Sequence, residues 1–236
     1  MMKRRVLFVW VLGGLLAPAA CSPGAATDAT ACTFMGQQQT CECAPMKVGT
    51  QSCGSDLHYG ACACPMGKRV FVTSGRYPGN LMATGGASDG LLGGDKLCQQ
   101  SAQAANLGGT WKAWLSAPGT DARSRIADVG PWYLVDGTTR VFNNLANLST
   151  TALAPIIRTE QNAMASGETA VWTGTTTGGA ASQTHCTSWT MTASSMGLLT
   201  GTVGDAGSAG EWTQRTQGGN TTLLCSTTAR LYCFEQ

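Results

Sequence analysis

The sequence contains few charged residues. Asp, Glu, Lys and Arg make up 12% of its 236 residues, about half of the usual share of roughly 25%. Domains that bind nucleic acids usually carry a basic stripe or patch, and a formal net charge of +2 provides little material for one. The composition therefore argues against a nucleic-acid partner.

Histidine is scarcer still, with only His58 and His185 in the chain. A hydrolase triad needs a histidine base beside a nucleophile and an acid. His58 lies among closely spaced cysteines, so His185, next to Cys186, is the one candidate base. We expect a structural or surface histidine there, and a protein that is not an enzyme.

The chain also lacks the run of about 20 apolar residues that a membrane-spanning helix needs. Its longest apolar segment, residues 6–17, follows Lys3, Arg4 and Arg5. A positive segment followed by a short apolar one is typical of a secretory signal peptide. We therefore assign residues 1–20 to a signal peptide.

Pro18, Ala19 and Ala20 precede Cys21, and small residues before a cysteine resemble the lipobox of bacterial lipoproteins. The resemblance implies cleavage before Cys21 and a lipid on its thiol, although Pro18 stands where an aliphatic residue is usual. The retention signal of inner-membrane lipoproteins is an Asp after the lipid-bearing cysteine, and Ser22 stands there instead. We therefore expect the protein to be located in the outer membrane or at the cell surface. The alternative is ordinary cleavage after Ala20, which would release a secreted protein.

Cleavage at this point removes three of the fifteen basic residues and none of the thirteen acidic ones. The mature chain then carries a net charge of −1. The apparent basicity therefore belongs largely to the signal peptide, and a polybasic binding surface loses its support.

Eleven cysteines indicate an exported protein stabilised by disulfides.

Residues 21–31 are small and polar and predict a lipid-anchored flexible linker. Residues 32–66 form a short Cys-rich module that must rely on disulfides because it has little core; we favour disulfides over zinc, and their pairing stays open. Its cysteines are Cys32, Cys41, Cys43, Cys53, Cys62 and Cys64.

Residues 67–236 predict one domain of the α+β class. We expect strands near residues 68–74, 111–115, 171–174 and 230–234, and a hairpin from residues 133–135 and 140–142. Asp95 is a suitable N-cap for a helix that runs to about residue 106. Gly, Ser, Thr and Ala dominate between these elements, so we expect long loops.

Six ordered blocks in this domain closely resemble a bacterial family of unassigned function found on surface lipoproteins, and also endostatin. The blocks lie at residues 97–100, 107–116, 133–136, 170–174, 185–189 and 231–235. The resemblance implies a C-type-lectin-like fold for residues 67–236. It also implies two nested disulfides, Cys98 with Cys233 and Cys186 with Cys225.

Lectins of this fold commonly bind sugars through calcium, but their E-P-N, Q-P-D and W-N-D motifs are absent here. We therefore expect no cofactor or metal. Calcium is the alternative, although no motif in the sequence indicates a calcium site. Asp205 and Glu211 lie on a long loop, where lectins of this fold could place the side chains that bind a ligand. Trp212 follows in a Gly- and Ser-rich segment. An aromatic residue in such a loop is a candidate stacking platform. Trp132, after Gly130 and Pro131, is a similar case.

These observations predict a lipid-anchored, non-catalytic protein for recognition or adhesion at the cell surface. Its partners would be the membrane, through the anchor, and a glycan, matrix component or envelope protein. The first alternative is a structural envelope lipoprotein without a soluble ligand. The second is an enzyme built on a C-type-lectin-like fold.

Overall fold

A computed structural model describes residues 31–44, 47–62, 67–193, 198–216 and 220–236. The predicted signal peptide, Cys21 and nearly all of the predicted linker lie outside these ranges. The chain divides into two compact units, residues 1–65 and 66–236, which are described separately. Among the described residues, no helix is long and apolar enough to cross a membrane.

The first unit is a disulfide-linked β-ribbon. Strands β1 (Gln38–Ala44) and β2 (Lys47–Ser52) pair antiparallel, with Gln38 opposite Ser52. Disulfides join Cys32 to Cys53 and Cys41 to Cys62. Among its described residues, the unit buries a small apolar cluster around Cys32, Cys53 and Tyr59, so covalent links supply much of its stability.

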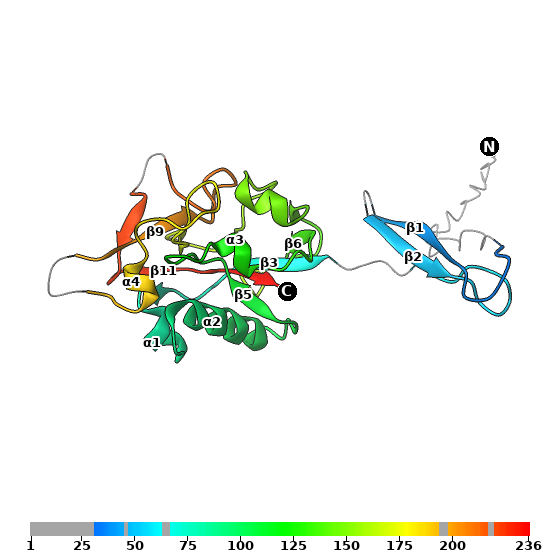
Figure 1. Ribbon diagram of the computed structural model, residues 1–236, viewed down its shortest axis with the longest axis horizontal. Helices are drawn as coiled ribbons and strands as arrows, with labels where there is room; N and C mark the ends of the chain where they lie inside the picture. The colour runs from blue at the N-terminus through cyan, green and yellow to red at the C-terminus, as the bar shows by residue number, and fades with distance from the viewer. Residues whose placement is uncertain (1–30, 45–46, 63–66, 194–197, 217–219) are drawn as a thin grey trace, which may run out of the picture. The chain divides into compact units, whose positions relative to one another are not determined.

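The second unit is a mixed α+β domain with few helices, as the sequence predicts (Figure 1). Its main sheet has the order β5-β12-β3-β6-β7, and only the β3–β6 pair is parallel. The first and last strands of the unit, β3 and β12, are therefore neighbours at the centre of the sheet. The strands are β3 (Lys68–Val72), β5 (Trp111–Ala113), β6 (Trp132–Leu134), β7 (Arg140–Phe142) and β12 (Tyr232–Glu235).

Two smaller sheets complete the β-structure. One has the order β10-β9-β8, and the other pairs β11 with β4. Their bounds are β4 (Tyr77–Pro78), β8 (Ala170–Trp172), β9 (Thr200–Asp205), β10 (Thr222–Leu224) and β11 (Thr228–Ala229). The helical segments are α1 (Leu81–Gly85), α2 (Gly90–Ala104), α3 (Ala122–Arg125), α4 (Cys186–Trp189) and the 3₁₀ turn η1 (Leu145–Ser149).

Apolar side chains cover both faces of the main sheet, because successive residues of a strand point to opposite faces. On β3, Val70 and Val72 join one buried cluster while Phe71 joins the other. On β12, Tyr232 and Phe234 join the first cluster and Cys233 joins the second. The second cluster includes buried residues of α2, so this helix covers one face of the sheet.

Helix α2 begins six residues earlier than the sequence suggests. Its N-cap is Asp89, whose side chain accepts a hydrogen bond from the backbone N–H of Leu92 at 2.8 Å. Asp95 instead lies inside the helix. The early start contains glycines where other segments approach closely: a Cβ on Gly93 would lie 2.2 Å from the carbonyl oxygen of Leu81 on α1, and one on Gly90 would lie 2.2 Å from that of Ser188 on α4.

Segment α4 is a single left-handed turn. Its four residues, none of them glycine, have φ between 51° and 64°, a conformation that costs L-residues roughly 1–2 kcal/mol each. The disulfide from Cys186 to Cys225 holds one end of the turn. The buried indole of Trp189 donates to the carbonyl of Ser116 at 2.8 Å and holds the other end.

Candidate functional site

Trp212, predicted as a stacking platform, is a core residue. Only 1% of it is exposed. Its ring centroid lies 4.8 Å from that of Trp114 and 4.9 Å from that of Phe142, and its indole N–H donates to the carbonyl of Thr150 at 2.9 Å. A buried ring offers no face to a ligand, so the prediction of a stacking platform is wrong. Trp132 is fully buried as well.

Asp205 and Glu211 use their carboxylates to hold their own loop. Asp205 Oδ1 accepts the backbone N–H of Gly207 at 2.8 Å, and its Oδ2 lies 3.2 Å from Arg215 Nη2. Glu211 Oε1 accepts the backbone N–H and the hydroxyl of Thr216 at 2.8 and 2.6 Å. These two side chains therefore order a loop over Trp212 and do not converge on a shared ligand position.

Across the described ranges, His, Cys, Asp and Glu residues nowhere gather in a group of three or more that could hold a metal ion. No ligand set for calcium can therefore be named from these residues.

His185 caps the left-handed turn. Its Nδ1 accepts the backbone N–H of Ser188 at 2.8 Å. That nitrogen therefore lacks a free lone pair for abstracting a proton. The geometry gives His185 a structural task, in keeping with the expectation drawn from the sequence.

The cysteines of the second unit form the two disulfides that the endostatin resemblance implies. Cys98 on α2 is bonded to Cys233 on β12, and Cys186 is bonded to Cys225. In the first unit the side chain of Cys43 and the whole of Cys64 lie outside the described residues. The pairing of these two cysteines therefore stays open.

A polar pocket of about 180 Å³ lies where the 159–166 loop meets the residues that follow β3 and precede β12. This volume is below the roughly 300–1,000 Å³ that is typical of sites for drug-sized ligands. The pocket therefore suits one ring or one polar group of a larger molecule. Its lining includes Ser74, Thr159, Gln161, Met164, Ser166 and Arg230.

Arg230 is the buried cation of this pocket, with 5% of the residue exposed. Its Nη1 donates to the carbonyls of Thr73 and Ser74 at 2.6 and 2.8 Å, and its Nη2 donates to that of Ser166 at 2.9 Å. In the part of the chain that the structure describes, no carboxylate lies within ion-pair distance of it. Burial, followed by the nearby charge of Arg76, lowers the pKa of Arg230, and the nearby charge of Glu160 partly opposes this shift. The pocket thus contains a guanidinium that is hydrogen-bonded but not ion-paired.

Two buried residues support the pocket from the loop side. Thr159 is 4% exposed, and its hydroxyl has no hydrogen-bond partner in the described structure. Glu160, 5% exposed, accepts the backbone N–H of Ser74 at 2.8 Å and also contacts the Ser74 hydroxyl. Leaving a buried hydroxyl without a partner is costly, so Thr159 is a locally strained position in the pocket wall.

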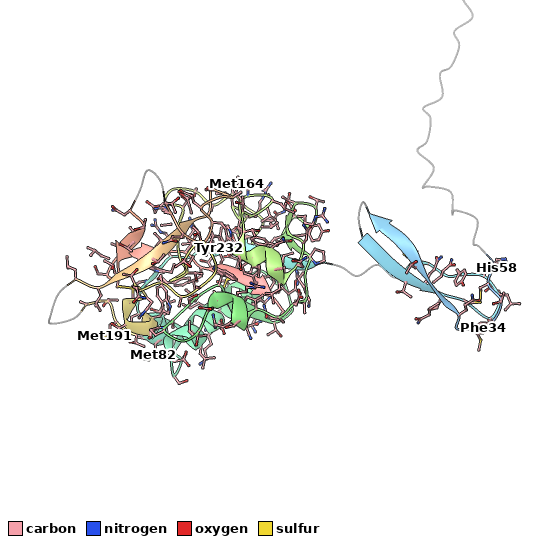
Figure 2. All side chains as sticks on the ribbon, turned by 45° about the horizontal axis from the view of Figure 1, so that its top comes forward. Phe34, His58, Met82, Met164, Met191 and Tyr232 are labelled. Carbon is pink, nitrogen blue, oxygen red and sulfur yellow. A yellow bond between two sulfur atoms is a disulfide. The ribbon has the colours of Figure 1, made fainter. Side chains whose placement is uncertain are left out.

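Apolar surface lies beside these polar groups. Met164 lines the pocket and is 57% exposed, and Ala163 and Ala165 line it too. Figure 2 shows Met164 at the surface of the second unit. A pocket with hydroxyl, amide and guanidinium groups beside a methionine can bind a molecule that has both hydroxyls and C–H faces, and a sugar ring is such a molecule.

A second cleft, of about 280 Å³, lies between α3, η1 and the 178–180 turn. Asp121 on its wall accepts the backbone N–H of Ala181 at 2.7 Å, and Arg123 donates to the Ser149 hydroxyl at 3.3 Å. Both residues are exposed, and no buried charged residue is found among the described residues that line the cleft. We therefore take the 159–166 pocket as the candidate site.

Sequence reasoning did not find this pocket. Its residues come from three distant segments, and the 159–166 loop has no periodicity that marks it. The one available signal was Arg230, a cation directly before the apolar run of residues 231–234. Such a residue is rarely buried unless its donors are satisfied.

Comparison with known proteins gives one family. Residues 81–209 match the family described as "Protein of unknown function (DUF1554)". No curated protein matches the chain. The endostatin and lipoprotein resemblances stay predictions, while the predicted family of unassigned function is confirmed over these residues. Because the match spans more than half of the chain, the protein belongs to the DUF1554 family.

Proposed function

We propose that this protein is a non-catalytic recognition protein of the cell envelope that binds glycans through the 159–166 pocket. The observation that carries the proposal is the pocket itself. It combines the buried, non-ion-paired Arg230 and the polar residues Ser74 and Gln161 with the exposed apolar surface of Met164. The small volume and the polar lining of the pocket suit one sugar residue of a longer glycan chain.

The proposed fold is C-type-lectin-like. The central β3–β12 pair and the Cys98–Cys233 disulfide, which links α2 to the last strand, support this proposal. So do the long loops between short strands. A rigid core that carries long loops is a common arrangement for binding, although a fold alone does not fix a function.

The proposed location is the outer membrane or the cell surface, through a lipid on Cys21. Residues 18–21 support it, and so does the even number of cysteines that remain once Cys21 is set aside. Mass spectrometry of the mature protein purified from membranes tests this part. An acylated Cys21 is expected, and a free N-terminal Cys21 or an intact signal peptide would contradict it.

The binding proposal is tested on a glycan array with the disulfide-intact mature chain, with calcium and with EDTA. We expect saturable binding in both conditions. Ala163→Trp should abolish it, because Ala163 is exposed and its enlarged side chain would fill the pocket. The matched control is Ala180→Trp, the same change at an exposed residue of the second cleft.

The two variants separate the outcomes. Loss of binding in Ala163→Trp with retention in Ala180→Trp supports the proposal. The reverse result would move the site to the second cleft and overturn it. No binding by the folded wild-type chain to any glycan would also overturn it.

A further inference from the structure

The first unit ends in an exposed apolar tip formed by Phe34, Met35 and Leu57. These side chains are 62%, 70% and 48% exposed. The buried apolar cluster found in the described part of this unit is small. Apolar residues of this size, gathered at one end of a small unit, are typical of an interaction surface.

The tip is built as one rigid feature from two loops. The Cys32–Cys53 disulfide joins the loops, Gly36 donates its backbone N–H to the carbonyl of Cys53 at 2.9 Å, and Cys32 donates to that of Leu57 at 2.9 Å. Figure 2 shows Phe34 and His58 at the same end of the unit. Because the loops are fixed to each other, ordering the tip on a surface costs little conformational entropy.

The chain enters the unit at this same end. Ala31 pairs with His58, the residue after Leu57. Only ten residues, 22–31, separate the tip end from Cys21, and ten residues span at most about 35 Å when fully extended. A lipid on Cys21 would therefore keep the tip within about 35 Å of the bilayer.

We infer that the tip formed by Phe34, Met35 and Leu57 inserts into the interface of the membrane that carries the lipid anchor. The anchor is part of the proposed function, and the insertion rests on it. The contact would be apolar and not electrostatic, because Asp56 is the only acid or base in either loop besides His58. Insertion of a few apolar side chains together with an acyl chain gives the two signals that stable anchoring needs.

Oxidation of methionine by hydrogen peroxide tests the contact on the complete mature protein. Met35 should form its sulfoxide several-fold more slowly on phosphatidylcholine vesicles than in vesicle-free solution, because the bilayer covers it. Met164, 57% exposed in the second unit, is the control in the same molecule and should react at the same rate in both. In a Phe34→Ser, Leu57→Ser variant, Met35 should lose its protection.

The result that would overturn the inference is an equal rate for Met35 with and without vesicles. Equal protection of Met35 and Met164 would also overturn it, since it would mean general shielding by the vesicle. Protection of Met35 in vesicle-free solution that increases with protein concentration would overturn it as well, since it would indicate that a second copy of the chain covers the tip.

A second arm separates this inference from the proposed anchor. A Cys21→Ser chain with a hexahistidine segment in place of residues 1–20 is bound to vesicles that contain a nickel-chelating lipid. Selective protection of Met35 there supports the tip even if Cys21 proves not to be acylated. Acylated Cys21 without protection of Met35 in either arm keeps the anchor and rejects the tip.

Discussion

Asp95 Oδ1 lies 2.7 Å from Arg125 Nη2 and accepts the backbone N–H of Ala113 at 2.8 Å. Arg125 also donates to the carbonyls of Ala113 and Leu115. The two side chains, 17% and 10% exposed, thus join α2, β5 and α3. The ion pair is therefore part of the internal structure and not of the solvated surface.

Asp95→Asn should lower the free energy of unfolding by about 2 kcal/mol, because it leaves the Arg125 charge partly buried without its counter-charge. The matched control is Asp89→Asn on the same helix, which should change stability little because Asn is an equally good N-cap. Urea denaturation measures both. A larger loss in Asp89→Asn than in Asp95→Asn would contradict the assignment.

Trp212→Ala should lower the free energy of unfolding by about 3–5 kcal/mol, the usual effect of removing a large aromatic side chain from a core. Its contacts with Trp114 and Phe142 would be lost. The check is thermal or chemical denaturation monitored by near-UV circular dichroism. A stably folded variant that had lost only ligand binding would contradict the core assignment.

Tyr232→Phe should stabilise the protein by about 1 kcal/mol, because the Tyr232 hydroxyl is buried without a hydrogen-bond partner in the described structure. Burial also raises the pKa of Tyr232 well above its ordinary value of 10.0. The neutral form is therefore favoured in the folded state, and stability falls as the pH rises above about 10. The Phe variant should lose less stability than the wild type between pH 9 and 11, as urea titrations would show. A variant that is less stable than the wild type at pH 7 would contradict this.

Acid should weaken the fold through Glu168. A hydrogen bond from Arg215 lowers the pKa of Glu168 below its ordinary value of 4.5. Its contribution is therefore present above pH 4.5 and is lost as the pH falls through the folded-state pKa. The side chain is 47% exposed, so we expect only a few tenths of a kcal/mol. Glu168→Gln should show a shallower fall in stability between pH 5 and 3; an identical slope would count against this role.

The sequence predicted the α+β class, the five strands of the main sheet and β8, because their apolar runs are visible as local patterns. It did not predict the ribbon strands β1 and β2, or the strands β4, β9, β10 and β11 of the smaller sheets. It missed the start of α2. Gly90, Gly93 and Gly94 are weak helix formers, so the periodic pattern appeared to begin at Asp95. The glycines are needed for tertiary packing, because Ser188, Leu81 and Leu115 lie against Gly90, Gly93 and Gly94 respectively. No local pattern in the sequence shows these contacts.

The site was missed for a related reason. Trp212 stands among Gly, Ser and Ala residues, so its sequence context suggested an exposed loop, but its neighbours Trp114, Phe142 and Tyr232 come from other segments. The pocket likewise joins Ser74, Thr159 and Arg230 from distant positions. The disulfide partners could be expected only because the resemblance implied them.

Saturation-transfer-difference NMR with neutral hexoses, hexosamines and uronic acids on the disulfide-intact mature chain tests sugar binding in the 159–166 pocket directly. We expect saturation transfer to at least one of these sugars, its loss in Ala163→Trp, and its retention in Ala180→Trp. Transfer that is unchanged in Ala163→Trp, or no transfer to any of the sugars from the folded wild-type chain, would contradict a glycan site in the 159–166 pocket.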